Sequence, residues 1–243
     1  MATTPMSDKV LLETTGDTAT LTLNRPEEGN AVDLELMLAL TERLEEVAAG
    51  KDLRVLVIEG RGDHFCSGRQ PDVPRPENAA QFAEALGRIV RVNKLLQSFP
   101  GISLAVVRGK AFGFGCGLAV QSDVTLAAED ARFAFPEINA GFPPTIVMSY
   151  LSRWIHRKKA FELVMTGGEI SASEAERQGL VNRVVPADQL EDEKKRWLET
   201  LAGRDLDGLQ ATKAFFRDTA EWSTNAAAQY GVTRLANYFA SRS

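Results

Sequence analysis

The apolar residues of this chain follow two different spacings, which together predict a mixed α/β fold. Between Thr18 and Leu23 every second residue is apolar, the pattern of a strand with one buried face. Between Leu36 and Val47 the apolar residues recur every three or four positions, which is typical of an amphipathic helix. Because segments of both kinds follow one another as far as Pro186, we predict a mixed sheet with crossover helices.

Turn and capping residues set the expected element boundaries. Strands are expected at 10–14, 18–23, 54–59, 102–107, 124–127, 132–135 and 180–185. Helices are expected between Asp33 and Gly50, between Ser171 and Gly179, and at 78–99, 144–154 and 158–165. Beyond residue 187 charges increase and strand patterns end, so we expect a core at 1–187 and a helical region at 188–243.

The stretch 102–123 is the most informative part of the pattern. It predicts a strand buried on both faces, a tight turn and an uncharged buried helix that Gly113-Phe114-Gly115 opens. The first N–H groups of a helix lack intrahelical partners, so the Phe114 N–H suits an oxygen that gains negative charge. The alternative is that these glycines only allow close packing of helix and strand.

Glu137 is the most conspicuous ionisable residue outside the expected helices. Most glutamates lie at the surface, but this one follows Pro136 within a segment that contains Phe133, Phe135, Ile138 and Phe142. If it is buried, its pKa should rise, and it could then move protons near neutral pH.

Composition excludes several classes of function. The net charge of −5 argues against nucleic acid as a partner, and no apolar run approaches the length of a membrane span. The first ten residues lack the apolar core of a signal peptide. Only two cysteines and two histidines are present, without metal-binding spacing, so neither a zinc site nor a disulfide framework is indicated. These features favour a cytoplasmic location.

Five motifs in order resemble those of the crotonase superfamily, the enoyl-CoA hydratases and isomerases. They are LNRPEEGNAV, HFCSGRQ, GKAFGFGCGLAVQSD, FAFPEINAGFPP and MTGGEISASEAERQGLVNRVVP. The resemblance implies a crotonase-like spiral of ββα units with a helical C-terminal region that serves oligomerisation and covers the site. It also implies a homotrimer or hexamer, a role in lipid or fatty acid metabolism, and an acyl-CoA substrate. No cofactor is implied other than the coenzyme A of the substrate, and no metal.

The resemblance also assigns roles to residues. Two backbone N–H groups would hold the thioester oxygen as it becomes an enolate: that of Arg69, after Gly68, and that of Phe114. Glu137 would be the acid and base. The residues expected to bind the substrate or its coenzyme A are Cys66, Gly68, Arg69, Gln70, Gly113, Phe114, Pro136 and Glu137.

Two departures from the family pattern bear on the reaction. Hydratases of the family usually carry a further glutamate, and the matching residue here is Gly117. The usual aspartate after the first oxyanion donor is Gln70. A single carboxylate suffices to take a proton from one carbon and return it to another, so we expect double-bond isomerisation of an enoyl-CoA. A glutamate restored at position 117 is then expected to favour hydration if the variant folds. The alternative is that packing requires glycine at 117, and a larger side chain would then only destabilise the buried helix.

Alternatives remain open from the sequence. Some family members hydrate aromatic enoyl-CoAs with one glutamate, so an enoyl-CoA hydratase or hydratase-lyase is the second hypothesis, and a non-catalytic CoA-binding or assembly protein is the third. His64 is either an acid near the thioester or a solvated loop residue, and we favour the latter. Cys66 and Cys116 lack a neighbouring base and are expected to be small buried residues. Arg25 and Arg69 are either surface residues or contacts of the CoA phosphates.

Overall fold

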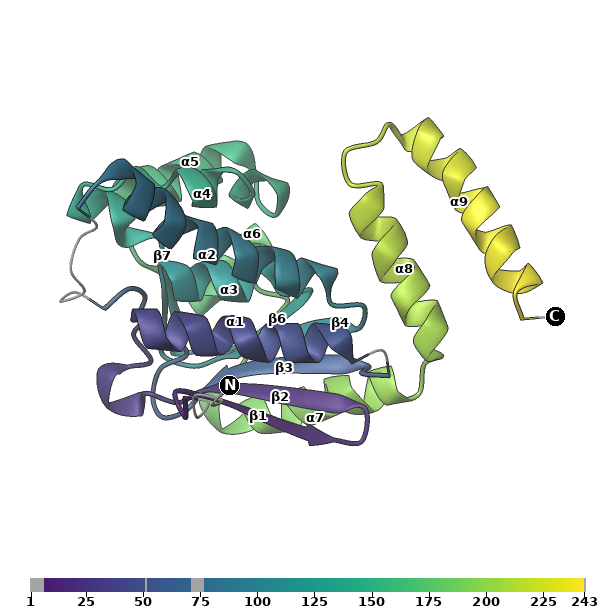
Figure 1. Cartoon of the computed structure of the whole chain (residues 1–243), viewed down its shortest axis with the longest axis horizontal. Coiled ribbons are helices and arrows are strands. Elements are labelled where there is room, and N and C mark those ends of the chain that lie inside the picture. The colour runs from purple at the N-terminus through teal and green to yellow at the C-terminus, as the bar shows by residue number, and fades with distance from the viewer. Residues whose placement is uncertain (1–6, 51, 71–76, 243) are drawn as a thin grey trace, which may run out of the picture.

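A six-stranded sheet forms the centre of the protein in the computed structural model, which describes residues 7–50, 52–70 and 77–242 (Figure 1). Its strand order is β1-β2-β3-β4-β6-β9, with β1 antiparallel to β2 and the other neighbours parallel. The bounds are Val10–Thr15, Thr18–Leu23, Val55–Gly60, Ile102–Val107, Val124–Ala128 and Arg183–Val185, in that order. The predicted mixed α/β class is confirmed.

Helices cover both faces of this sheet. One face packs against α1 (Leu34–Ala49), α2 (Ala79–Ser98) and α3 (Phe114–Gln121), and the other against α7 (Leu190–Ala202). Within β4, Ala105 and Val107 belong to the first core, whereas Leu104 and Val106 belong to the second. The prediction that strand β4 is buried on both faces is therefore confirmed.

A smaller sheet lies beside the main one and had not been expected as a unit. It contains β5 (Lys110–Phe112), β7 (Arg132–Ala134) and β8 (Ile170–Ser171), with β5 parallel to β7 and β7 antiparallel to β8. Strands of two or three residues are too short to show an alternating pattern, which is why β5 and β8 were missed. The segments 124–128 and 132–134 thus enter different sheets.

Capping residues fix most helix starts where they were predicted. The Asp33 carboxylate accepts the Leu36 N–H at 2.8 Å, and Ser171 Oγ accepts the Glu174 N–H at 3.2 Å, opening α6 (Ala172–Gln178). The helix expected at 144–154 is wrong: α4 covers Thr145–Met148 and a 3₁₀ turn covers Leu151–Arg153. The chain leaves helical geometry at Tyr150, whose φ is −129°. The strand expected at 180–185 is shorter, and α5 spans Arg157–Thr166.

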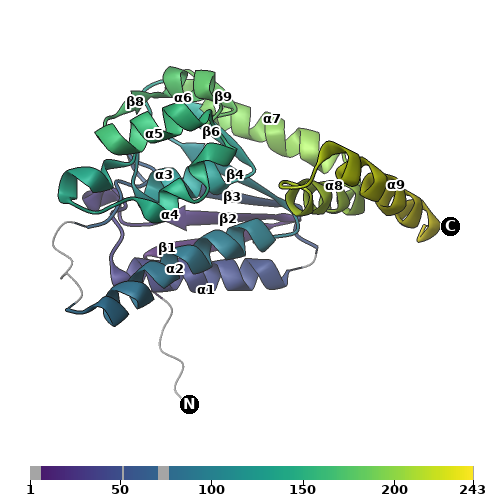
Figure 2. The ribbon, with the colours of Figure 1, turned by 90° about the horizontal axis from the view of Figure 1, so that it is seen from above.

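The C-terminal helices α8 (Leu206–Asp218) and α9 (Thr224–Ala240) form an arm that extends from the core (Figures 1 and 2). Lys213 anchors α8: its Nζ lies 2.6 Å from Asp123 Oδ2 and donates to the Gly101 carbonyl at 2.8 Å. Asp123 also accepts from the N–H and hydroxyl of Ser103, so it joins three segments. The domain boundary proposed after residue 187 falls within the 3₁₀ turn Ala187–Gln189, and α7 beyond it completes the second core.

Candidate active site

Three parallel segments bring the predicted site residues to one edge of the small sheet. Ala111 in β5 pairs with Phe133 in β7, and an isolated parallel bridge pairs Ala111 with Cys66 on its other side. Parallel segments run in the same direction, so residues that follow the paired positions by the same number of residues lie close together. Arg69 and Phe114 both follow their matched residues by three positions and Glu137 follows Phe133 by four. The register thus gathers residues that are distant in sequence.

The loop that holds Arg69 is fixed by backbone contacts on both sides. The Gly68 carbonyl accepts the Val32 N–H at 2.8 Å, and the Gln70 N–H donates to the Val32 carbonyl at 3.0 Å. Since backbone groups alternate along an extended segment, the Arg69 N–H is directed away from Val32. Gly68 has a φ of +94°, and a Cβ there would lie 3.0 Å from the Phe112 carbonyl oxygen. Only glycine lets this loop approach the end of β5 so closely.

The start of α3 supplies a second backbone donor. Gly113 is its N-cap with a φ of 52°, and Phe114 is its first residue. The Phe114 N–H makes no hydrogen bond with any residue that the structure describes, as expected at a helix N-terminus. A Cβ on Gly113 would lie 3.2 Å from Glu137 Oε1 and 3.9 Å from the Gly68 Cα. Gly113 therefore lies next to both the glutamate and the loop that holds Arg69.

Glu137 is half-buried in the 3₁₀ turn Pro136–Ala140, directly after β7. Its Oε2 is enclosed and has no hydrogen-bond partner in the described part of the chain. Burial raises the pKa of this carboxyl, and a hydrogen bond from its own backbone N–H offsets part of the rise. The expectation that a buried Glu137 would have a raised pKa is confirmed, and the group is suited to proton transfer near neutral pH.

Tyr150 is a residue of this site that the sequence had not indicated. Its side chain is buried, and a Cβ on Gly117 would lie only 2.6 Å from its hydroxyl oxygen. Burial first, and then the charges of Cys116 and Glu137, raise the pKa of Tyr150, so the phenol stays neutral. No periodicity or spacing marks Tyr150, because its position depends on the break between α4 and the following turn.

The two cysteines are buried packing residues, as expected. Neither thiol is exposed to solvent, and burial raises the pKa of Cys66 to about 12 and that of Cys116 well above its ordinary value. The Cys66 backbone exchanges hydrogen bonds with Lys110 and Phe112 at 2.9 Å each. Cys66 therefore holds the Arg69 loop against β5, and its buried side chain does not line an open surface.

Arg25 and Gln70 form an internal contact. Both terminal nitrogens of Arg25 donate to Gln70 Oε1 at 3.0 Å, and Arg25 Nη1 also lies 3.3 Å from Asp33. The Arg25 side chain is only 10% exposed, so it is not a plain surface arginine, and its contact with CoA phosphates stays a prediction. Gln70 in place of the usual aspartate thus shapes the loop. His64 Nδ1 accepts the Lys110 N–H at 3.3 Å and likewise supports the loop.

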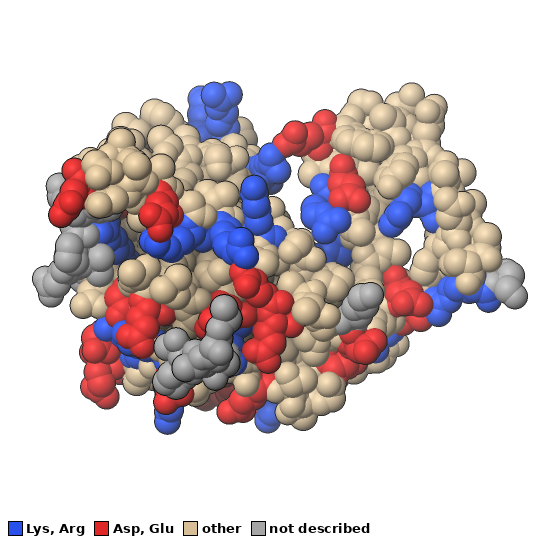
Figure 3. Space-filling view, in the orientation of Figure 1, with Lys and Arg blue, Asp and Glu red and all other residues tan. Residues whose placement is uncertain are grey.

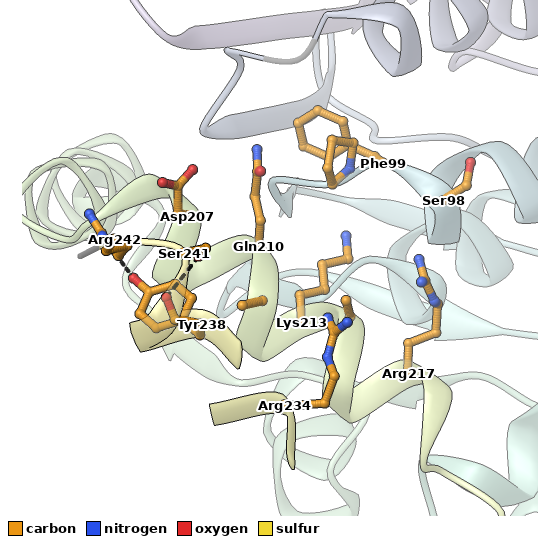
Figure 4. A pocket seen from close by; sticks show the side chains of 13 residues that line it. Ser98, Phe99, Asp207, Gln210, Lys213, Arg217, Arg234, Tyr238, Ser241 and Arg242 are labelled. Atoms are coloured by element: carbon orange, nitrogen blue, oxygen red, sulfur yellow. Dashed lines mark hydrogen bonds between the residues drawn. The ribbon is translucent and has the colours of Figure 1, made fainter. Parts of the chain in front are cut away.

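A cavity of about 480 Å³ lies between the end of α2 and the arm and shares no residue with the Glu137 cluster (Figure 4). Four cationic side chains line it, among them Lys213, whose ammonium lies over the Phe99 ring. Three of them already have carboxylate partners: Lys213 pairs with Asp123, Arg217 with Asp218 and Arg242 with Asp205. The cavity therefore offers little uncompensated positive charge to an anion.

Two further features concern the whole described chain. Within the described ranges, no group of three or more His, Cys, Asp and Glu side chains is placed to hold a metal ion. None of the helices in those ranges is long and apolar enough to cross a membrane.

Comparison with known proteins identifies the family of this chain. The family model described as enoyl-CoA hydratase/isomerase matches residues 13–243, and the chain therefore belongs to this family of enzymes, within the crotonase superfamily. The protein named "Probable enoyl-CoA hydratase EchA12" of Mycobacterium tuberculosis is 37% identical over 207 residues, which cover 80% of this chain and 72% of the relative. A mouse relative, enoyl-CoA hydratase domain-containing protein 3, mitochondrial, is 32% identical over 197 residues, covering 81% and 66%.

A solved structure confirms the fold. The enoyl-CoA hydratase of Mycobacterium smegmatis superposes with a TM-score of 0.90 at 32% identity, over 96% of this chain and 91% of that one. The crotonase-type architecture expected from the motifs is therefore present. A cytoplasmic location stays a prediction, since one of these relatives is named as mitochondrial.

Proposed function

We propose that this enzyme shifts the double bond of an enoyl-CoA thioester through an oxyanion-stabilised enolate, with Glu137 as the single acid and base. The observation that carries the proposal is the placement of one half-buried carboxyl, with a raised pKa, against Gly113, which also adjoins the Gly68 loop. Position 117, where a second carboxylate would be expected in a hydratase, is glycine.

The backbone supplies the electrostatic part of the reaction. The N–H groups of Arg69 and Phe114 would donate to the thioester oxygen. Removing a proton next to the carbonyl transfers negative charge to this oxygen, so donors fixed in advance stabilise the transition state more than the ground state. The positive end of α3 adds to this effect at Phe114.

Glu137 supplies the proton transfer. The carboxylate takes a proton from the carbon next to the thioester of a 3-enoyl-CoA, and the electron pair moves into the dienolate. The same proton is then returned to the far carbon of the dienolate, giving a 2-enoyl-CoA. These two proton transfers consume no water and need no second carboxylate. Coenzyme A takes part only as the carrier of the substrate. A raised pKa balances the two half-reactions, because the same group must accept and donate.

Hydration of a 2-enoyl-CoA is the second candidate, since relatives of this chain are named enoyl-CoA hydratases. Hydration adds the hydroxyl of water to the far carbon and a proton to the near one. Glu137 would then have to deprotonate water and protonate carbon without a second carboxylate. The two candidates differ in product, which makes them separable.

The test is incubation with 3-enoyl, 2-enoyl and cinnamoyl-type CoA thioesters, with products identified by mass and absorbance. Isomerisation gives a product of unchanged mass with the absorbance of a conjugated thioester. We expect this product from the 3-enoyl substrate and little addition of water to the others. A gain of 18 mass units as the dominant outcome from the 2-enoyl or cinnamoyl-type substrate would overturn isomerase in favour of hydratase. The gain of 18 mass units is the mass of the one water molecule that hydration adds.

We also propose a trimer or hexamer, assembled through the arm. In α9 the exposed apolar residues Val232, Leu235 and Phe239 are three and four positions apart and thus form one stripe. Phe216 of α8 is 75% exposed, and much of the arm carries no charge on the face seen in Figure 3. Apolar patches of this kind mark association surfaces, and copies of the same chain fit the family pattern.

A further inference from the structure

The space beside Gly117 is occupied by another side chain. A Cβ at this position would lie 2.6 Å from the Tyr150 hydroxyl oxygen, but 3.9 Å from Cζ of the same ring. Contacts below about 3 Å do not occur between real atoms of these kinds, whereas 3.9 Å is ordinary van der Waals contact. The hydroxyl oxygen alone therefore blocks a side chain at 117.

Tyr150 is buried in this position. The residue is 8% exposed and packs within the main hydrophobic core. Its hydroxyl makes no hydrogen bond with any residue in the described ranges. Burial first, and then the charges of Cys116 and Glu137, raise the pKa of Tyr150, so its hydroxyl stays protonated. A neutral phenol can donate a hydrogen bond there but cannot remove a proton from water.

The geometry points to Tyr150 as a residue that determines reaction specificity by filling the place of a second carboxylate and of the water beside it. The inference rests on the proposed enolate chemistry at Glu137. When a positioned water adds to the far carbon of a 2-enoyl-CoA, its oxygen bonds to that carbon, its proton goes to the base, and the resulting enolate is protonated at the near carbon. Without that water, only removal and return of a substrate proton is available. Tyr150 thus favours isomerisation because it excludes the water that hydration needs.

Gly117→Glu alone is therefore not expected to favour hydration. A glutamate introduced there alone does not restore the two-carboxylate arrangement, because its Cβ would meet the Tyr150 oxygen. The substitution has to be combined with Tyr150→Phe, which removes that oxygen and leaves the ring. Glycine at 117 and tyrosine at 150 are therefore a matched pair.

A stability cycle tests the contact. Gly117→Ala in the otherwise unchanged chain should lower the melting temperature by roughly 5 °C, since overpacking a core is costly and the chain is long. In the Tyr150→Phe background the same alanine should lower it by less than about 2 °C, because 3.9 Å is an unstrained distance. Equal losses in both backgrounds would show that Tyr150 does not occupy this space.

A product-ratio experiment tests the function. Tyr150→Phe leaves a space of about the size of one oxygen beside Gly117, and water entering it should raise the ratio of hydration to isomerisation roughly tenfold or more. Gly117→Ala with Tyr150→Phe fills that space with a methyl group, so the ratio should return towards that of the unmodified enzyme. Gly117→Glu with Tyr150→Phe should give the highest ratio. Tyr230→Phe, the same change in the arm, is the control and should leave the ratio unchanged.

Exchange of the α-hydrogen of a saturated acyl-CoA with deuterated water separates this inference from the proposed function. Exchange reports enolate formation whatever the later step. An unmodified enzyme with neither exchange nor isomerisation would overturn the proposed function. Exchange and isomerisation with a product ratio that Tyr150→Phe does not move would overturn the role of Tyr150 alone.

Discussion

Replacing Glu137 by glutamine changes the charge of one group and keeps its size. If Glu137 is the only acid and base, Glu137→Gln should lower kcat by about 10²–10⁴, the usual contribution of such catalysis, which equals about 3–5 kcal/mol of barrier height. The assay is conversion of a 3-enoyl-CoA followed by the absorbance of the conjugated product. In the unmodified enzyme, kcat/KM should fall as the pH is lowered through the raised pKa of Glu137, because the base must be ionised.

The same substitution should stabilise the fold at neutral pH. Oε2 of Glu137 is enclosed without a hydrogen-bond partner among the described residues, and an unsatisfied buried acceptor costs about 1–3 kcal/mol. The group is only half-buried and glutamine keeps a polar atom there, so we expect a gain of about 1 kcal/mol, or about 2–4 °C in melting temperature.

The sign of the pH dependence follows from the raised pKa. Between the unfolded value near 4.5 and the higher folded value, the folded state binds more protons than the unfolded state, so stability falls as the pH rises through this window. The advantage of Glu137→Gln should therefore be present above the folded pKa and vanish below pH 4.5. Glu129→Gln, the same change at an exposed turn, is the control. Full activity of Glu137→Gln would refute the mechanism, and a loss of stability at neutral pH would refute the burial argument.

Three further changes probe the donor, the arm and the assembly. Phe114→Pro removes the backbone donor at the first position of α3, where proline is compatible with a helix, and should abolish turnover. Phe114→Ala keeps the donor and should retain much of the activity. Equal activity of a folded proline variant and the unmodified enzyme would exclude this donor. Lys213→Met leaves Asp123 without its cation and should destabilise the protein by about 3 kcal/mol in thermal unfolding. Lys195→Met changes an exposed lysine and should not destabilise it. Equal melting temperatures of the two variants would mean that the Lys213–Asp123 pair does not anchor α8. Sedimentation should show a trimer or hexamer that Leu235→Glu dissociates, and a stable monomer of 26.5 kDa before substitution would contradict the assembly.

The sequence by itself determined most of the main sheet and its helices. The alternation in 18–23, the helical spacing after Asp33 and the uncharged run after Gly113 are local signals that burial and capping impose directly on residue types. It also marked Glu137 as a candidate for burial, because an isolated carboxyl among aromatic residues is unusual.

Only the tertiary structure decided how these parts form a site. The short strand β5 carries too few residues for a periodic signal, yet its parallel register with β7 places the start of α3 beside Glu137. Tyr150 enters the site because the chain leaves helical geometry there and directs the ring onto Gly117. The absence of a side chain at 117 is visible in the sequence. What fills the vacated space depends on packing between segments more than thirty residues apart, and local sequence patterns carry no information about such contacts.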